Sequence, residues 1–205
     1  MDEEAILKRT FSLYSKYGIK SVGVDDVAFM LGMSKKTIYE RFKNRETLIG
    51  RAVRNNIDSF VKGLDDVMRP DGDVFTRLCR FYAYLIKSTR KINPAFIHDL
   101  KKYSRQQYKL FIQLRDEKLY EIVSQIIKKG ISEGIFRDDV PDKYLYNNQM
   151  DKVLMMVHES RFQDDTPLLP SLVAYMLILN DIRGITTQKG HEELEKRYET
   201  LLKLI

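Results

Sequence analysis

Apolar residues recur at three- and four-residue spacing along most of the chain, which is the pattern of amphipathic helices. Glycine and proline interrupt this pattern and mark where helices end. The amino-terminal pattern predicts a first helix that ends at Gly18, two short helices over residues 24–31 and 35–41, and a longer helix between Asn44 and Pro70. No alternating run is convincing enough to predict a sheet. The chain is therefore expected to be all-α.

Beyond Pro70 the same spacing continues to the carboxy terminus. A long amphipathic run ends at Gly130 and Gly134, and Phe136 is expected to return the chain to the core. The pattern in this part predicts helices over residues 108–131, 142–162, 167–184 and 191–205.

Residues 24 to 42 have the spacing of a helix-turn-helix. Ala28 is small where the two helices would cross, Gly32 permits positive φ in the tight turn, and Ser34 can cap the second helix. On a helical wheel the inward positions are apolar and the outward ones polar, which suits a helix that lies in a major groove. The apolar contacts come from Val27, Leu31, Met33, Ile38 and Phe42, and the outward or flanking set is Lys36, Thr37, Tyr39, Glu40 and Lys43.

Charge supports a polyanionic partner without proving one. The formal net charge is +6 and the pI is near 9.2, and residues 1–51 hold ten cations against seven anions. From Lys35 to Arg45 there are five cations and a single acid. Such a run alone is as often a solvated face, but within a helix-turn-helix it favours contact with DNA.

The amino-terminal region resembles the DNA-binding domain of TetR-type transcriptional regulators over residues 5 to 51. The resemblance implies a three-helix helix-turn-helix domain over residues 1–51, a connecting helix over about 45–67, and a larger helical ligand-binding and dimerisation domain over 52–205. Gly23 departs from the pattern, since the family usually has Ser or Thr there as a helix cap. The matching residues are Phe11, Gly18, Val27-Ala28, Leu31-Gly32-Met33-Ser34, Thr37-Ile38-Tyr39, Phe42-Lys43-Asn44 and Glu46-Thr47-Leu48.

Roles in DNA binding follow from this resemblance, position by position. Thr37, Tyr39 and Lys43 match residues that contact phosphates, although Tyr39 could instead be a buried ring. Lys36, Lys35 and Glu40 occupy positions that can reach base edges. The full set expected at the DNA interface is Ser34, Lys35, Lys36, Thr37, Tyr39, Glu40, Lys43 and Asn44.

The two helices expected over residues 142–162 and 167–184 are rich in Met, Leu and Val. They carry more apolar surface than one core-facing stripe requires, so two helices from each of two subunits could form a four-helix bundle. A purely intramolecular core remains the alternative. The residues expected at this homodimer interface are Met150, Val153, Val157, Leu172, Val173, Met176 and Leu179.

The resemblance also implies a cavity for a small-molecule effector in the carboxy-terminal part. No acid stands clearly on an apolar face there, so a mainly apolar, neutral or weakly anionic compound is expected. The same residues would equally make an ordinary filled core. The candidate lining is Ile57, Phe60, Leu64, Tyr82, Phe111, Met150, Leu154 and His158.

Other chemistries find little support in the sequence. Cys79 is single, and His98, His158 and His191 lack the paired spacing of a metal site, so no metal or cofactor is expected. No signal peptide or membrane span is visible, which favours the cytoplasm. The leading hypothesis is a ligand-responsive homodimeric regulator, a repressor, on a pseudo-palindromic operator of double-stranded DNA. The alternatives are an architectural DNA-binding protein without ligand control and, with less support, an enzyme.

Overall fold

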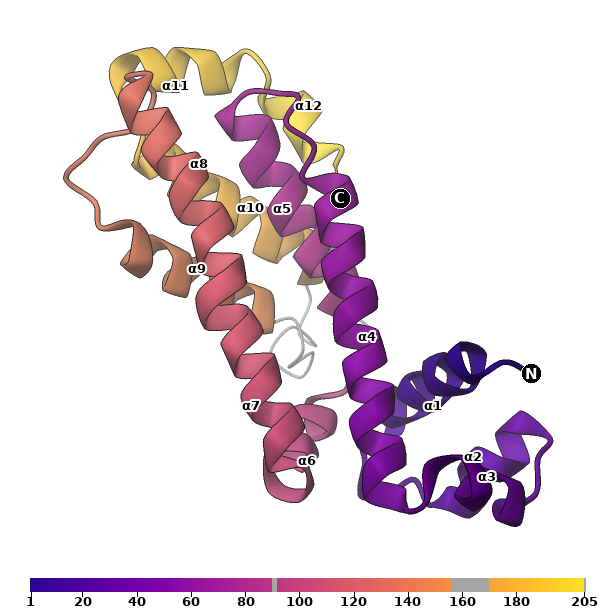
Figure 1. The fold of residues 1–205 in the computed structure, drawn as a ribbon. Coiled ribbons are helices and arrows are strands. Elements are labelled where there is room, and N and C mark those ends of the chain that lie inside the picture. Colours follow the sequence, from indigo (N-terminus) through magenta and orange to yellow (C-terminus); the bar gives the residue numbers. More distant parts are fainter. Residues whose placement is uncertain (90–91, 156–169, 205) are drawn as a thin grey trace. The chain divides into compact units, whose positions relative to one another are not determined.

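The computed structural model of the chain describes residues 1–89, 92–155 and 170–204. Within these residues the regular elements are helices, joined at one point by an isolated antiparallel bridge between Phe136 and Thr186 (Figure 1). The expectation of an all-α chain is confirmed. The chain divides into two compact units: unit 1 comprises Met1–Gly63 with Lys91–Leu114, and unit 2 comprises Leu64–Arg90 with Arg115–Ile205. The functional boundary drawn at residue 51 remains a prediction, because compactness describes packing rather than function.

Unit 1 contains the elements that the amino-terminal pattern predicted. The first three helices begin and end within a few residues of the expected positions, and the fourth starts at the expected Arg45. The elements are α1 (Glu3–Tyr17), α2 (Val24–Leu31), α3 (Lys35–Phe42), the first part of α4 (Arg45–Val67), α6 (Pro94–Tyr103) and α7 (Arg105–Gln113).

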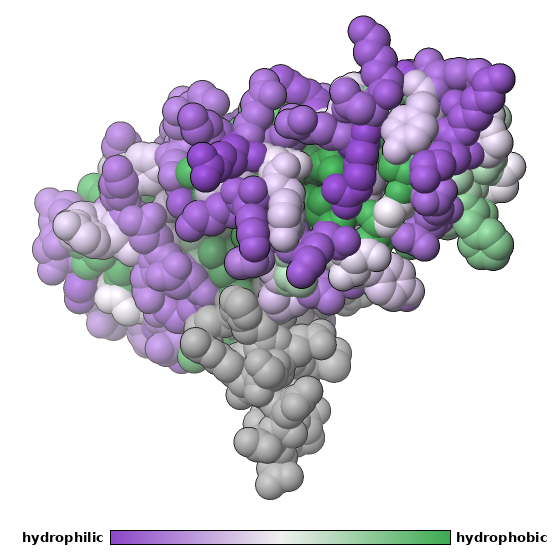
Figure 2. Space-filling model, turned by 90° about the horizontal axis from the view of Figure 1, so that it is seen from below, coloured by the Kyte–Doolittle hydropathy of each residue, from purple (hydrophilic) through white to green (hydrophobic). Residues whose placement is uncertain are grey.

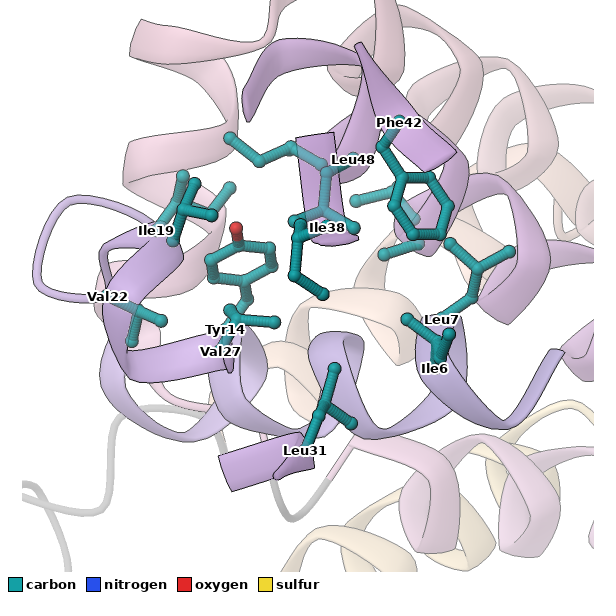
Figure 3. Packing of buried hydrophobic residues seen from close by; sticks show 14 of the residues in the cluster. Ile6, Leu7, Tyr14, Ile19, Val22, Val27, Leu31, Ile38, Phe42 and Leu48 are labelled. Atoms are coloured by element: carbon teal, nitrogen blue, oxygen red, sulfur yellow. The ribbon is translucent and has the colours of Figure 1, made fainter. Parts of the chain in front are cut away.

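The core of unit 1 forms where α1, α2, α3 and the start of α4 meet. Figure 3 shows the ring of Tyr14 beside Val27 and Ile38, with Leu48 of α4 close to Ile38. These four side chains are fully buried. Apolar residues at three- and four-residue spacing thus bring four helices onto one core, which holds α2 and α3 at a fixed angle.

Unit 2 contains the end of α4, α5 (Val74–Thr89), all but the first residue of a π-helical segment η1 (Leu114–Leu119), α8 (Tyr120–Ser132), α9 (Asp142–Met155), α10 (Pro170–Gly184), α11 (Gln188–Glu195) and α12 (Tyr198–Leu202). The run expected to be one helix over 108–131 instead comprises the end of α7, η1 and α8. Phe136 returns to the core as expected: it is buried and meets the ring of Phe75 edge-on at 5.4 Å.

The tail is a correction to the sequence analysis, since residues 191–205 do not form one helix. α11 ends at Glu195 and α12 starts at Tyr198. Arg197 lies between them and pairs with Asp73, and the hydroxyl of Tyr175 donates to the carbonyl of Leu201 at 2.9 Å. These tertiary contacts outweigh the local pattern, which predicts a continuous helix.

Among the described residues, no helix is both long and apolar enough to cross a membrane. Hydrophilic side chains cover most of the face shown in Figure 2, and apolar ones appear between them in smaller areas. Isolated apolar residues of this kind are normal on a protein surface.

Candidate DNA-binding site

The turn between α2 and α3 has the geometry that the helix-turn-helix spacing predicts. Gly32 has a φ of 63° in the left-handed region, which glycine adopts without steric cost. The amide of Met33 donates to the carbonyl of Ala28 at 2.9 Å, so the end of α2 is closed by the turn itself. Val27 and Ile38 are buried on the two sides of this turn. The orientation of α3 is therefore set by local sequence and by one shared core.

Ser34 caps the start of α3, as expected. Its hydroxyl accepts a hydrogen bond from the backbone amide of Thr37 at 3.0 Å, and the two hydroxyl oxygens lie 2.8 Å apart. This satisfies one of the free amides at the start of the helix. At the start of α2, Gly23 has no side chain to offer, and the carboxylate of Asp26 accepts from the Gly23 amide at 2.7 Å instead. The departure at Gly23 is thus compensated locally.

The outward face of α3 carries its charged residues into solvent. The side chains of Lys36 and Glu40 are 86% and 61% exposed and lie 3.9 Å apart as a weak pair one turn apart. Tyr39 is 37% exposed, so it is not the buried ring that the alternative interpretation required. These groups are free to rearrange toward a ligand surface.

Lys35 differs from Lys36 because it already has a partner. Its ammonium donates to the carboxylate of Asp25 at 2.8 Å. This hydrogen bond, together with the charge of Asp25, raises the pKa of Lys35 above its ordinary value of 10.5. The pair is exposed, and exposed pairs contribute little stability, so a phosphate could replace Asp25 at small cost.

Lys43 and Asn44 form the junction between α3 and α4. Lys43 has a φ of 58°, and among the described residues it is the non-glycine residue with positive φ. This backbone conformation disfavours a residue with a Cβ. The side-chain oxygen of Asn44 accepts from the amide of Thr47 at 2.8 Å and caps α4.

Arg45 and Arg51, two cations of α4, have structural contacts that sequence reasoning missed. The guanidinium of Arg45 donates to the carbonyls of Ile19 and Val22, the latter at 3.1 Å, and so ties α4 to the loop between α1 and α2. Arg51 pairs with Glu3 and lies over the ring of Phe42, 5.3 Å from its centroid. Nothing in their spacing distinguishes them from the cations of α3.

Unit 1 also includes a later chain segment that the sequence assigned to the second domain. The amide of Asn93 donates to the carbonyl of Ser15 at 2.7 Å, at the end of α1. The buried carboxylate of Asp99 accepts from the backbone amide of Lys20 at 2.7 Å. A Cβ at Gly18 would lie 3.0 Å from that carboxylate, and Gly18 has a φ of 85°. The loop that leads into α2 is therefore held by α6.

The predicted pocket residues fall into both units. Ile57, Phe60 and Phe111 belong to unit 1, whereas Leu64, Tyr82, Met150 and Leu154 belong to unit 2. His158 lies outside the described residues. A single pocket lined by all of these residues remains a prediction.

The predicted dimer interface remains a prediction. Met150, Val153 and Leu179 are buried inside unit 2 of a single chain, so they contribute to its own core. The wheel of a short apolar helix does not reveal which of two faces the chain itself covers. Leu172 and Val173 are half-buried, and Met176 is exposed. Val157 lies outside the described residues.

A polar groove of about 560 Å³ lies along α4 within unit 1. Its lining includes Arg51, Arg54, Gln106 and Gln107, and of the predicted DNA-contacting residues Asn44 reaches it.

Cys79 is buried in unit 2, where burial raises the pKa of its thiol to about 12 and leaves it unreactive. Over the described ranges, no three His, Cys, Asp or Glu side chains gather as metal ligands would.

Comparisons with known proteins agree with this geometry. Residues 6–52 match the family described as bacterial regulatory proteins, tetR family. The HTH-type transcriptional repressor KstR2 of Mycolicibacterium smegmatis is 18% identical over 190 residues, which are 91% of this chain and 92% of that protein.

Solved structures agree in fold. The ketosteroid transcriptional regulator KstR2 of Mycobacterium tuberculosis superposes with a TM-score of 0.68 at 18% identity, over 91% of this chain and 96% of that one. A transcriptional regulator from Saccharomonospora viridis, solved in complex with choline, has a TM-score of 0.77 at 18% identity, over 91% of this chain and 100% of that one. Residues 6–52 thus form a helix-turn-helix domain of the tetR family, and over most of its length the chain is similar to TetR-type DNA-binding transcriptional regulators.

Proposed function

We propose that the protein is a repressor that binds a pseudo-palindromic operator as a homodimer and releases it when a small molecule binds. The observation that carries the DNA-binding half of this proposal is the outward face of α3, where Lys36, Tyr39 and Glu40 are exposed on a helix fixed by its core. Because operator DNA is its partner, the protein is expected to act in the cytoplasm. The known regulators that it resembles include curated repressors.

The roles on DNA follow from position and exposure. Lys36 and Glu40, the most exposed pair of α3, read base edges, because a lysine can donate to guanine and a carboxylate can accept from cytosine. Tyr39 and Lys43 contact phosphates, and so does Thr37 once its hydroxyl leaves Ser34. Lys35 exchanges Asp25 for a phosphate or a base edge. Ser34 and Asn44 position the interface through their caps.

Homodimerisation uses the exposed apolar side chains of α10. Met176 and Leu177 are exposed on this helix, and Leu172 and Val173 are half-buried. Two copies of α10 would bury this surface against each other. The dimer places two α3 helices about 34 to 36 Å apart, one turn of the duplex. A small molecule that prefers a different spacing lowers operator affinity by its differential binding free energy.

The experiment is selection of bound fragments from genomic DNA, followed by equilibrium binding to the recovered operator at several salt concentrations. We expect a steep loss of affinity with salt, since each phosphate contact made by a cation releases counterions. Lys43→Ala should weaken binding to all sequences alike, whereas Glu40→Ala should change the preferred base at one position by about 1 to 3 kcal/mol.

The matched control is Lys62→Ala, which removes an exposed cation of α4 outside the helix-turn-helix. If Tyr39→Ala combined with Lys43→Ala leaves operator affinity unchanged in a folded protein, α3 is not the recognition helix. Equal affinity for unrelated duplexes would instead support the architectural alternative.

A further inference from the structure

Two polar side chains lie in the core of unit 2 without hydrogen-bond partners among the described residues. Gln149 of α9 is 0% exposed, and neither its Nε2 nor its Oε1 has a partner. Tyr82 of α5 is also 0% exposed, and its hydroxyl has none. Gln149 lies in the buried stripe of α9 with Tyr146, Met150 and Val153. Sequence reasoning proposed Tyr82 and Met150 for a pocket but missed Gln149.

Gln149 differs from the other unpartnered buried groups of the described chain. Those are single hydroxyls, which can rotate, or one nitrogen of an arginine that has other donors. In Gln149 the whole carboxamide lacks partners, so two donors and an acceptor are taken out of water at once. Buried polar groups in native proteins nearly always have a partner. The amide of Gln149 therefore needs a hydrogen-bond partner from outside the described residues.

The helices that carry Tyr82 and Gln149 are neighbours, and the charged groups near Tyr82 are already paired. α5 packs against α9, and the phenol of Tyr82 interacts electrostatically with Tyr146, one turn before Gln149, and with Asp181. Asp181 is already neutralised by Lys152 at 2.8 Å and accepts from Asn148 at 3.1 Å. Burial, followed by these two neighbours, raises the pKa of Tyr82 well above its ordinary value, so it stays a neutral phenol.

We propose that Gln149 and Tyr82 anchor the polar end of the effector, and that this effector is a neutral molecule with an apolar body and one group that both donates and accepts hydrogen bonds. A carboxamide or an alcohol meets this description, because it can satisfy both ends of the Gln149 amide. Met150 and Val153 supply apolar contact beside it. Asp181 and Lys152 already pair with each other, so neither offers a free counter-charge to a carboxylate or an ammonium, and burying either ion is disfavoured. The inference rests on the proposed effector control and specifies its ligand class.

The first test needs no ligand. Gln149→Met keeps the volume of the side chain and removes its unpartnered amide, so the full-length protein should gain about 2 to 8 °C in Tm. Tyr82→Phe should shift Tm in the same direction by less. The matched control is Gln125→Met on α8, an exposed position in the same unit, where little change is expected. An unchanged or lower Tm for Gln149→Met would overturn the proposal, because the amide would then be satisfied by the protein itself.

The second test uses a matched series of probes: cyclohexanecarboxamide, cyclohexanecarboxylate, cyclohexylmethylamine and methylcyclohexane. At millimolar concentration the carboxamide should raise the Tm of the wild type and of Gln125→Met, but not of Gln149→Met. It should also shift the side-chain NH2 signals of Gln149 in a ¹H–¹⁵N spectrum, assigned by their loss in Gln149→Met. Equal stabilisation of Gln149→Met, a larger shift with a charged probe, or no shift with the carboxamide would each overturn it.

Operator binding separates this inference from the proposed function. Without probes, Gln149→Met should bind the operator with affinity within about twofold of the wild type, since α3 is untouched. The carboxamide should lower operator affinity in the wild type and leave the variant unaffected. If the wild type binds the operator but the carboxamide never releases it, the ligand proposal fails and the DNA-binding proposal stands. If neither protein binds operator DNA, the proposed function fails first.

Discussion

α3 in unit 1 and α9 in unit 2 present polar side chains in opposite ways. On α3 the polar groups are exposed and the apolar groups Ile38 and Phe42 are buried, which is the ordinary pattern of an amphipathic helix. On α9 the buried stripe itself contains an amide, Gln149, while Tyr144 is 76% exposed on the same helix. An exposed polar face suits a large hydrated partner such as a duplex. A buried polar group suits one small molecule that can be enclosed.

The comparison also separates how the two regions are positioned. Caps and turns within a few residues fix α3: Ser34 at its start, Gly32 before it and Asn44 after it. Gln149 lies in the buried stripe of α9, which packs against helices distant in the sequence, such as α5. The ends of α3 are therefore set by neighbouring residues, whereas the proposed small-molecule site depends on how distant helices pack.

The largest effect is expected from removing a buried ring that packs α3 onto the rest of unit 1. Phe42→Ala deletes a fully buried ring that closes α3, and we expect a loss of about 3 to 5 kcal/mol in the free energy of unfolding, together with loss of operator binding. Phe29→Ala is the matched control, because that ring is 90% exposed on α2 and should change stability by less than about 0.5 kcal/mol. Urea denaturation and operator titration measure both. Similar losses for the two variants would contradict the burial pattern.

A smaller effect should separate stability from binding at the end of α3. Lys43→Gly relieves a side chain held at a φ of 58°, so the free energy of unfolding should rise by up to about 1 kcal/mol. The same change removes a cation from the proposed DNA-binding surface, so operator affinity and its salt dependence should both fall. Lys43→Ala keeps the backbone cost and serves as the control. A more stable variant with unchanged affinity would remove Lys43 from the interface.

The smallest expected effect concerns pH and unit 2. Burial alone would raise the pKa of Asp73, but hydrogen bonds from the side chain and amide of Thr76, with the charge of Arg197, lower it below 3.8. The native state then binds fewer protons than the unfolded chain, so the contribution of Asp73 is complete above about pH 4 and is lost as pH falls through the native pKa.

Urea midpoints of the wild type and of Asp73→Asn should therefore differ at pH 7 and converge toward pH 3. Arg197→Gln should lower the neutral-pH midpoint without removing the two hydrogen bonds from Thr76. A difference that stays constant across this range would show that the charge of Asp73 does not contribute.

Sequence reasoning succeeded where the determinants lie close together in the chain. The ends of α2 and the start of α3 follow from Gly32 and Ser34, which act on their nearest neighbours. It could not foresee that Arg45 binds loop carbonyls more than twenty residues away, because that contact exists only once the helices have packed. The interruption of the tail at Arg197 has the same origin, since Asp73 is far away in the sequence.

The candidate sites divide in the same way. Exposure of Lys36 and Glu40 could be predicted from helical periodicity, whereas burial of Met150 and Leu179 within one chain could not, because an apolar helix face looks alike in a core and at an interface. Gln149 was invisible for the opposite reason: a polar residue in a helical pattern is expected to face solvent.

The hydrogen bond between Asp99 and the amide of Lys20 joins residues 79 positions apart, and it makes unit 1 a discontinuous unit. During synthesis from the amino terminus, α1 to α3 emerge long before α6, so Lys20 waits for its acceptor until nearly half of the chain has been made. The Leu64–Arg90 segment, which belongs to unit 2, separates the two parts of unit 1 in the sequence. The contact between Lys20 and Asp99 therefore closes a long chain loop. The helix-turn-helix is therefore synthesised before part of its support, and the loop into α2 lacks its hydrogen bond to Asp99 until α6 has folded back onto α1.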